Sequence, residues 1–302
     1  MKSYISLTFI FLHLYIIMAS QTGFQHYYMY DAGNNPEEKK YEFGKMAIED
    51  KKLVKSQSKM ADSLWMQDIK KSIDQLLPAK NGLIVYIHGY QGDNKYFVQQ
   101  SGYVIQNDIF NQKEHHYGMA VSLQWKSVLP YDTAVKNAYE KGKNFVNQLD
   151  SIYTYLKAMH PEAPVTFITH SMGNRVWQGI FENWVKKRPD VYINNSIMFA
   201  ADLESNIFCS GFSGLEKSVG KVYIYHNLSD RTLQMANALK SHQRLGIVGP
   251  DLPLPETLDS ILVVRNATDI KDDESFAGKL TFHRYYYGSP TIRKEILAIL
   301  SK

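Results

Sequence analysis

The segment "VTFITHSMGN", from Val165 to Asn174, places a serine between two regular elements. Residues 165–168 are apolar or β-branched, which favours a buried strand. After Gly173, apolar side chains recur at the spacing of a helix, at Val176, Trp177, Ile180, Phe181, Trp184 and Val185. The segment therefore predicts a strand, a sharp turn that carries Ser171, and a helix.

Ser171 at this turn has two interpretations, a catalytic nucleophile or the cap of an ordinary helix. A nucleophile elbow usually reads Gly-x-Ser-x-Gly. Its flanking positions are small because the strand and helix backbones nearly touch there. Gly173 meets this need, whereas Thr169 stands where the first glycine is usual. Its two branches require small neighbours or a more open turn, so both interpretations stay open at this point.

The rest of the chain alternates between apolar runs and amphipathic helices. Strands are predicted at 82–90, 118–125, 193–201, 221–227 and 260–267. Helices are predicted at 60–77, from Ala134 to Leu156 as one long helix, at about 231–240, and at 289–300. Continuous apolar strands are typical of a parallel sheet that is buried on both faces. The pattern predicts an α/β fold with a mostly parallel twisted sheet and helices on both faces.

The first twenty residues, "MKSYISLTFIFLHLYIIMAS", have the layout of a secretory signal peptide. Their apolar run is short for a spanning helix. We expect export, to a periplasm or to the medium, with no stable membrane span after the leader is cleaved; retention as an anchor is the alternative. Residues 21–80 are expected to form a lead-in, with a hairpin or edge strands, packed on a single core at 81–302.

Composition bounds the function further. The 302 residues are 44% hydrophobic and 21% charged, and the net charge of +4 is spread along the chain. No basic run or aromatic-basic stripe is present, which argues against nucleic-acid binding. The adjacent pair His115-His116 suits no metal site, no glycine-rich cofactor fingerprint occurs, and we expect neither metal nor cofactor. The single cysteine, Cys209, is expected to be buried. Nothing in the sequence indicates an oligomeric state.

Polar residues follow the predicted strands, at the sheet edge where ligands of parallel sheets bind. Ser171, Asp230 and His283 occur in the chain order of an α/β-hydrolase triad. A serine hydroxyl needs a neutral imidazole to take its proton, and the imidazole needs an acidic partner. Asp202 follows another strand and is the alternative acid. His283 is preferred to His242 as the base because only His283 follows the last strand.

Acyl transfer also needs hydrogen-bond donors aimed at the oxyanion. The backbone N–H of Met172, at the start of the predicted helix, is one candidate donor. A second is expected from Tyr90, in the turn that follows the first strong strand. His88 and Gly89 precede Tyr90 and are expected to support this oxyanion loop.

Six blocks occur in order: "IVYIHGY", "ITHSMGNRVW", "FAADLE", "IYHNLSDRTL", "RLG" and "HRYYYGSP". From Gly82 to the C-terminus the chain resembles alpha/beta hydrolases of unknown function that are grouped with esterases and lipases. The elbow of that family usually reads Ala-His-Ser-Met-Gly-Asn, so a residue other than glycine is usual there, and Thr169 departs from it only in replacing Ala. The resemblance implies an α/β-hydrolase fold with Ser171 as nucleophile. It implies no particular substrate.

These observations lead to one expectation and two alternatives. We expect an exported serine hydrolase, similar to carboxylesterases, that acts on a small-molecule or lipid-like ester through an acyl-enzyme. One alternative is a non-catalytic α/β-hydrolase-like binding protein of the cell envelope. The other is an acyltransferase or amidase that uses the same triad.

Overall fold

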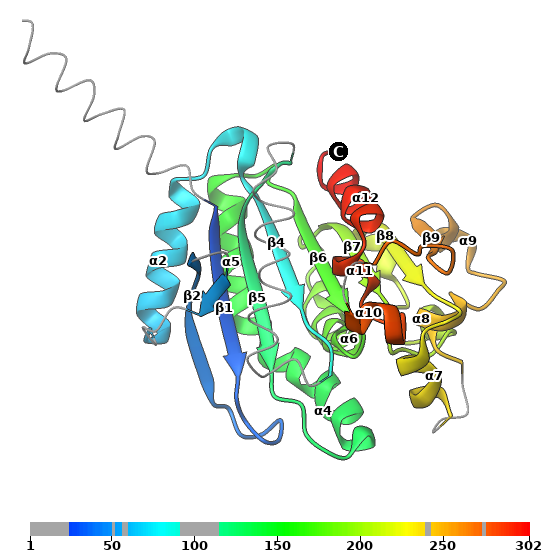
Figure 1. Cartoon of the computed structure of the whole chain (residues 1–302). Helices are drawn as coiled ribbons and strands as arrows, with labels where there is room; N and C mark the ends of the chain where they lie inside the picture. Colours follow the sequence, from blue (N-terminus) through cyan, green and yellow to red (C-terminus); the bar gives the residue numbers. More distant parts are fainter. Residues whose placement is uncertain (1–23, 50–51, 56–59, 91–114, 239–242, 274–275) are drawn as a thin grey trace, which may run out of the picture.

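The computed structural model of the protein describes residues 24–49, 52–55, 60–90, 115–238, 243–273 and 276–302. The predicted leader at 1–20 and His242 lie outside the described residues. None of the described helices is long and apolar enough to cross a membrane. The described strands form one sheet in the order β3-β2-β1-β5-β4-β6-β7-β8-β9, with helices packed against it (Figure 1).

The sheet is mostly parallel, which confirms the predicted fold class. Its strands are β1 (Gln25–Asp31), β2 (Tyr41–Glu49), β3 (Lys52–Lys55), β4 (Gly82–Ile87), β5 (Tyr117–Trp125), β6 (Val165–His170), β7 (Ile193–Phe199), β8 (Val219–His226) and β9 (Leu262–Asn266). Among the pairings of these described strands, only β1–β2 and β2–β3 are antiparallel. Residues 21–80 thus contribute strands to the sheet itself, since β1 pairs in parallel with β5.

Helices cover both faces of the sheet. They are α2 (Asp62–Asp74), α4 (Tyr131–Asn144), α5 (Val146–Met159), α6 (Gly173–Asn183), α7 (Arg231–Asn237), α8 (Leu245–Val248), α9 (Glu256–Asp259), α10 (Phe276–Thr281), α11 (Tyr285–Gly288) and α12 (Pro290–Leu300). Short 3₁₀ helices lie at Pro78–Lys80, Val185–Lys187, Ile207–Cys209 and Leu215–Lys217. The α/β alternation expected from the sequence is therefore present from β4 onward.

Two expectations about local structure are wrong. The long helix is two helices, α4 and α5, which meet at Phe145. There the Asn144 amide donates to Asp31 Oδ2 at 2.9 Å and to Pro36 O at 3.0 Å, while the Phe145 side chain is fully buried. Cys209 is exposed rather than buried.

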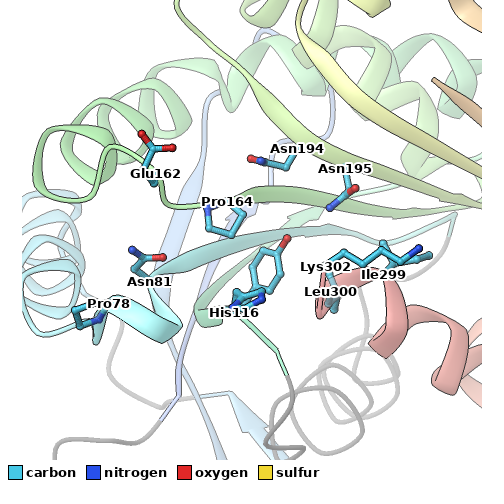
Figure 2. Close-up of a pocket in the computed structure, with 11 residues that line it drawn as sticks. Pro78, Asn81, His116, Glu162, Pro164, Asn194, Asn195, Ile299, Leu300 and Lys302 are labelled. Atoms are coloured by element: carbon cyan, nitrogen blue, oxygen red, sulfur yellow. The ribbon is translucent and has the colours of Figure 1, made fainter. Parts of the chain in front are cut away.

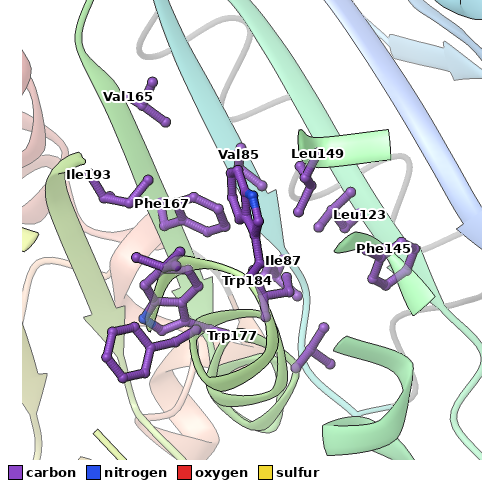
Figure 3. Close-up of a cluster of buried hydrophobic side chains, with 14 of the residues drawn as sticks. Val85, Ile87, Leu123, Phe145, Leu149, Val165, Phe167, Trp177, Trp184 and Ile193 are labelled. Atoms are coloured by element: carbon purple, nitrogen blue, oxygen red, sulfur yellow. The ribbon is translucent and has the colours of Figure 1, made fainter. Parts of the chain in front are cut away.

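Two apolar cores lie on opposite faces of the sheet. Figure 3 shows the larger one, in which the α6 side chain of Trp177 stacks on Phe167 of β6 with ring centroids 4.1 Å apart. The smaller core joins α11 and α12 to the inner strands, for example through Tyr286 against Phe199. Burial of such a side chain contributes roughly 1.5–3 kcal/mol. The cores thereby hold the carboxyl ends of β4, β6, β7 and β8 in fixed relation to one another.

A buried ion pair fixes α4 against the end of β1. The Lys141 ammonium is fully buried and donates to Asp31 Oδ1 at 2.6 Å, to Gly33 O at 3.0 Å and to Asn35 O at 3.2 Å. A buried charge is tolerated only when it is paired and hydrogen-bonded in this way. The pair anchors the helix whose first residue, Tyr131, lies beside the candidate site.

Candidate active site

Ser171 lies on the sharp turn between β6 and α6 with a φ of 53°, in the left-handed region that side chains rarely adopt. The strain is held by main-chain hydrogen bonds. Ser171 N donates to Phe199 O at 2.9 Å, and Asn174 N donates to Ser171 O at 3.1 Å. A helix cap ordinarily has extended backbone, and α6 has no side-chain cap. Ser171 is therefore not an ordinary capping serine, and its strained turn is the candidate nucleophile elbow.

Two glycines allow the backbones to approach at this turn. A Cβ atom at Gly173 would lie 2.4 Å from His88 O and 2.7 Å from Ile87 O. At Gly89 it would lie 2.8 Å from the Cβ of Ser171. The predicted need for a small residue after the serine is therefore physical, because main-chain atoms occupy the space that a side chain would take.

Thr169 fits at the elbow without glycine because its hydroxyl has a partner. The fully buried Thr169 Oγ1 donates to Asn174 Oδ1 at 2.6 Å. The Asn174 amide in turn donates to Ser171 O at 3.0 Å. Thr169 thus fixes the asparagine that holds the carbonyl of Ser171, a role that a glycine or alanine could not fill.

The structure brings His283 to Asp230. His283 lies between α10 and α11, and its Nδ1 is 2.7 Å from Asp230 Oδ2. Asp230 is fully buried and also caps α7, since its Oδ1 accepts from Leu233 N at 2.9 Å. Asp230 therefore caps α7 and holds His283 at the same time. With Nδ1 donating to the carboxylate, Nε2 of His283 is the nitrogen that can accept a proton.

No hydrogen bond joins Ser171 Oγ to His283 within the described part of the chain. An indirect connection runs through His170, the residue before Ser171, whose Nε2 donates to His283 O at 3.1 Å. In hydrolases without substrate, the nucleophile–base contact is often long and tightens when substrate binds. This bond from the His170 side chain holds the main chain of His283 close to the turn, and the ring centroids of His170 and His283 lie 4.7 Å apart.

His170 supports His283, a role that sequence reasoning missed because it depends on a contact 113 residues apart. His170 stacks on Tyr286 with centroids 4.5 Å apart. Burial lowers the pKa of His170 well below its ordinary value, and the nearby His283 lowers it further. His170 therefore stays neutral. A neutral imidazole still donates the hydrogen bond to His283 O. Phe282, which precedes His283, has a φ of 53°, and the cations of Arg231 and Lys271 lie 5.7 Å and 5.2 Å from the centroid of its ring.

His88 orders the segment that leads from β4 to Tyr90. Its Nε2 accepts from Trp125 N at 3.0 Å, so the ring proton is on Nδ1, which donates to Gly89 O at 2.6 Å. The ring also stacks on the fully buried Trp125, whose Nε1 donates to His88 O at 3.0 Å. These contacts hold Gly89 against Ser171.

The two candidate oxyanion donors follow the two residues that meet here, Ser171 and Gly89. Met172 directly follows Ser171 and precedes α6, and none of the described residues accepts a backbone hydrogen bond from its N–H. Tyr90 follows Gly89, which lies against Ser171. Backbone N–H groups at a helix start are well suited to a developing negative charge.

Asp202, the alternative acid, has other partners. Its Oδ2 accepts from the Tyr131 hydroxyl at 2.5 Å, and its Oδ1 lies 3.3 Å from Arg244 Nε. Its carboxylate is thus committed away from His283, which Asp230 contacts instead. In the described part of the chain, no three His, Cys, Asp or Glu side chains converge as they would around a metal ion.

A separate pocket lies at the other end of the strands. It has a volume of about 340 Å³ and is lined by residues that include Asn81, His116, Pro164, Asn194 and Leu300 (Figure 2). Asn81 and Pro164 directly precede β4 and β6, whereas Ser171 directly follows β6. The pocket is therefore remote from the elbow and forms no part of the candidate site.

A family model described as "Alpha/beta hydrolase of unknown function (DUF900)" matches residues 66–299. The chain belongs to this family. The matched region of this DUF900 protein contains β4–β9, the elbow, Asp230 and His283. Comparison with curated proteins found no match. Membership supports the α/β-hydrolase fold and a hydrolase-like function, and the family itself is assigned no reaction.

Proposed function

We propose that this DUF900 protein is a serine hydrolase that cleaves carboxylic esters through an acyl-enzyme on Ser171. The observation that carries the proposal is the 2.7 Å contact between His283 Nδ1 and Asp230 Oδ2 beside the strained elbow. A buried imidazole with one nitrogen held by a carboxylate is arranged to take a proton on the other nitrogen. The strained φ of Ser171 is consistent with a functional turn.

In the proposed reaction, Ser171 Oγ attacks the ester carbonyl carbon while His283 Nε2 takes the hydroxyl proton. The negative oxygen of the tetrahedral intermediate accepts hydrogen bonds from the N–H groups of Met172 and Tyr90. The intermediate collapses with loss of the alcohol, which takes the proton from His283. Water then attacks the acyl-enzyme by the same steps, and the acid and free Ser171 are released. Asp230 stabilises the imidazolium at each stage.

We further propose that the protein acts outside the cytoplasm. The support is the leader-like sequence at 1–20, with its single Lys and apolar run. The substrate is proposed to be a small-molecule or lipid-like ester, since the triad chemistry fits that class and no cofactor fingerprint is present in the sequence. A panel of esters of graded acyl length, tested on the protein without its leader, identifies the preferred length of the acyl group.

A fluorophosphonate probe should label the folded protein, and Ser171→Ala should abolish the labelling and lower ester hydrolysis by at least about 10⁴-fold. The probe reacts only with a serine that is activated by a base. Gel fluorescence measures the labelling, and release of nitrophenol from nitrophenyl esters measures hydrolysis. Ser151→Ala is the matched control, because Ser151 lies exposed on α5 and its hydroxyl donates to Asn147 O within the same helix.

Each alternative gives a different result. A non-catalytic binding protein leaves the well-folded wild type unlabelled, which would contradict the proposal. An acyltransferase or amidase is labelled at Ser171 but favours an amine or alcohol acceptor over water, or an amide over an ester. The Ser151→Ala control should match the wild type in every assay.

A further inference from the structure

Asp202 contacts the nucleophile and α4 at once. Its main-chain N–H donates to Ser171 O at 3.2 Å, and its side chain accepts from the Tyr131 hydroxyl at 2.5 Å. Asp202 is almost fully buried, so both contacts are shielded from water. The residue therefore links the strained elbow to the first residue of α4.

Tyr131 continues this link to the oxyanion loop. Its ring packs edge-on against Tyr90, with centroids 6.1 Å apart and planes at 80°. Burial raises the pKa of the Tyr131 hydroxyl, and the charge and hydrogen bond of Asp202 raise it further. Tyr131 therefore keeps its proton and remains a donor to Asp202. A continuous path of contacts runs from Ser171 through Asp202 and Tyr131 to Tyr90.

Buried arginines hold the acidic end of this path in place. The fully buried Arg244 lies 3.3 Å from Asp202 and donates to Glu204 Oε1 at 3.1 Å. Arg175, in the first turn of α6, donates to the same Glu204 oxygen at 2.9 Å. Burial raises the pKa of Glu204, but the hydrogen bond and charge of Arg175 and the charge of Arg244 outweigh this and lower it to about 2. Glu204 therefore stays charged, and the cluster is electrically balanced.

We propose that Tyr131 and Asp202 are positioning residues, which fix the N–H of Tyr90 relative to Ser171 for stabilisation of the oxyanion. The inference rests on the proposed function. Loss of one oxyanion donor typically costs about 10²–10³-fold in rate, and displacement of a reacting group by about 1 Å costs about 10²-fold. Release of the Tyr131 ring should displace the donor without removing it. The effect should therefore fall on kcat, because the oxyanion exists only after substrate has bound and begun to react.

Tyr131→Phe tests this most cleanly because it removes one hydroxyl and keeps the ring. We expect kcat and the rate constant of fluorophosphonate labelling to fall by about 10- to 100-fold, with KM within about twofold. Tyr139→Phe is the matched control. Tyr139 lies on the same helix, about 12 Å further along, and its hydroxyl makes the same kind of bond, to Glu182 Oε2 at 2.5 Å. Tyr139→Phe should leave kcat, KM and the labelling rate unchanged.

The time course of labelling distinguishes a misplaced oxyanion donor from partial unfolding of the variant. Partial unfolding of Tyr131→Phe lowers the final labelled fraction, whereas a misplaced oxyanion donor lowers the rate constant. Equal rate constants for Tyr131→Phe, Tyr139→Phe and the wild type would overturn the inference and leave the proposed function standing. A change in KM alone would also overturn it. A folded wild type that is never labelled would contradict the proposed function, and the inference with it.

Discussion

Asp230→Asn should lower kcat for ester hydrolysis by about 10³–10⁴-fold while the fold is retained. The carboxylate of Asp230 accepts from His283 Nδ1 at 2.7 Å, and this bond fixes the tautomer that leaves Nε2 free to act as the base. An amide at position 230 can present N–H to Nδ1 and so select the wrong tautomer. Asparagine is also a good helix cap, so the bond from Leu233 N can persist and α7 should stay formed.

Asp202→Asn is the matched control for this prediction. Its amide oxygen can still accept the Tyr131 hydroxyl, so we expect a loss of less than about tenfold in kcat, well below the effect of the 230 variant. Steady-state kinetics with a soluble ester measures both variants, and circular dichroism verifies their fold. An Asp202→Asn variant that loses as much kcat as Asp230→Asn, or more, would contradict the assignment of Asp230 as the acid.

Gly173→Ala should destabilise the protein by about 3 kcal/mol or more and abolish labelling of Ser171. The added methyl would meet His88 O at 2.4 Å and Ile87 O at 2.7 Å, and both oxygens belong to the main chain of the strand end. Overpacking of a core ordinarily costs about 1–3 kcal/mol, through shifts of side chains and backbone. At Gly173 the overlap with these main-chain oxygens can be relieved only if β4 and α6 move apart, and this movement also opens the turn at Ser171.

Gly214→Ala provides the comparison for that variant. Gly214 has a φ of 85° with no atom within 4 Å of an added Cβ, so only backbone strain opposes the substitution. We expect a loss of about 1–2 kcal/mol there. Urea unfolding at one temperature compares the two free energies of unfolding. A Gly173→Ala variant as stable as the wild type would show that the elbow is more open than these contacts require.

The sequence predicted the elements of the site better than their contacts. Buried parallel strands tend to be continuous apolar runs, so β4 and most of β5 could be predicted from the local sequence pattern alone. The break at Phe145 could not, because it depends on Asn144 reaching Asp31, more than one hundred residues earlier. Local periodicity carries no information about such a distant partner.

The choice between the two candidate acids required the three-dimensional structure. Asp230 and Asp202 both follow strands, and strand order alone places both at the same edge of the sheet. The two acids differ in their partners. The segment between α10 and α11 brings His283 to Asp230, whereas Asp202 contacts Arg244 and Tyr131. Thr169 is a similar case, since its tolerance at the elbow depends on the position of the Asn174 amide.

The central claim, a covalent acyl-enzyme on Ser171, is tested most directly by intact-protein mass spectrometry after rapid mixing with a nitrophenyl ester and an acid quench. We expect a burst of at most one equivalent of nitrophenol per protein. We also expect a matching gain of one acyl mass, which peptide mapping assigns to Ser171 and which Ser171→Ala lacks. Turnover with no acyl adduct in the burst, or an adduct on another residue, would contradict it.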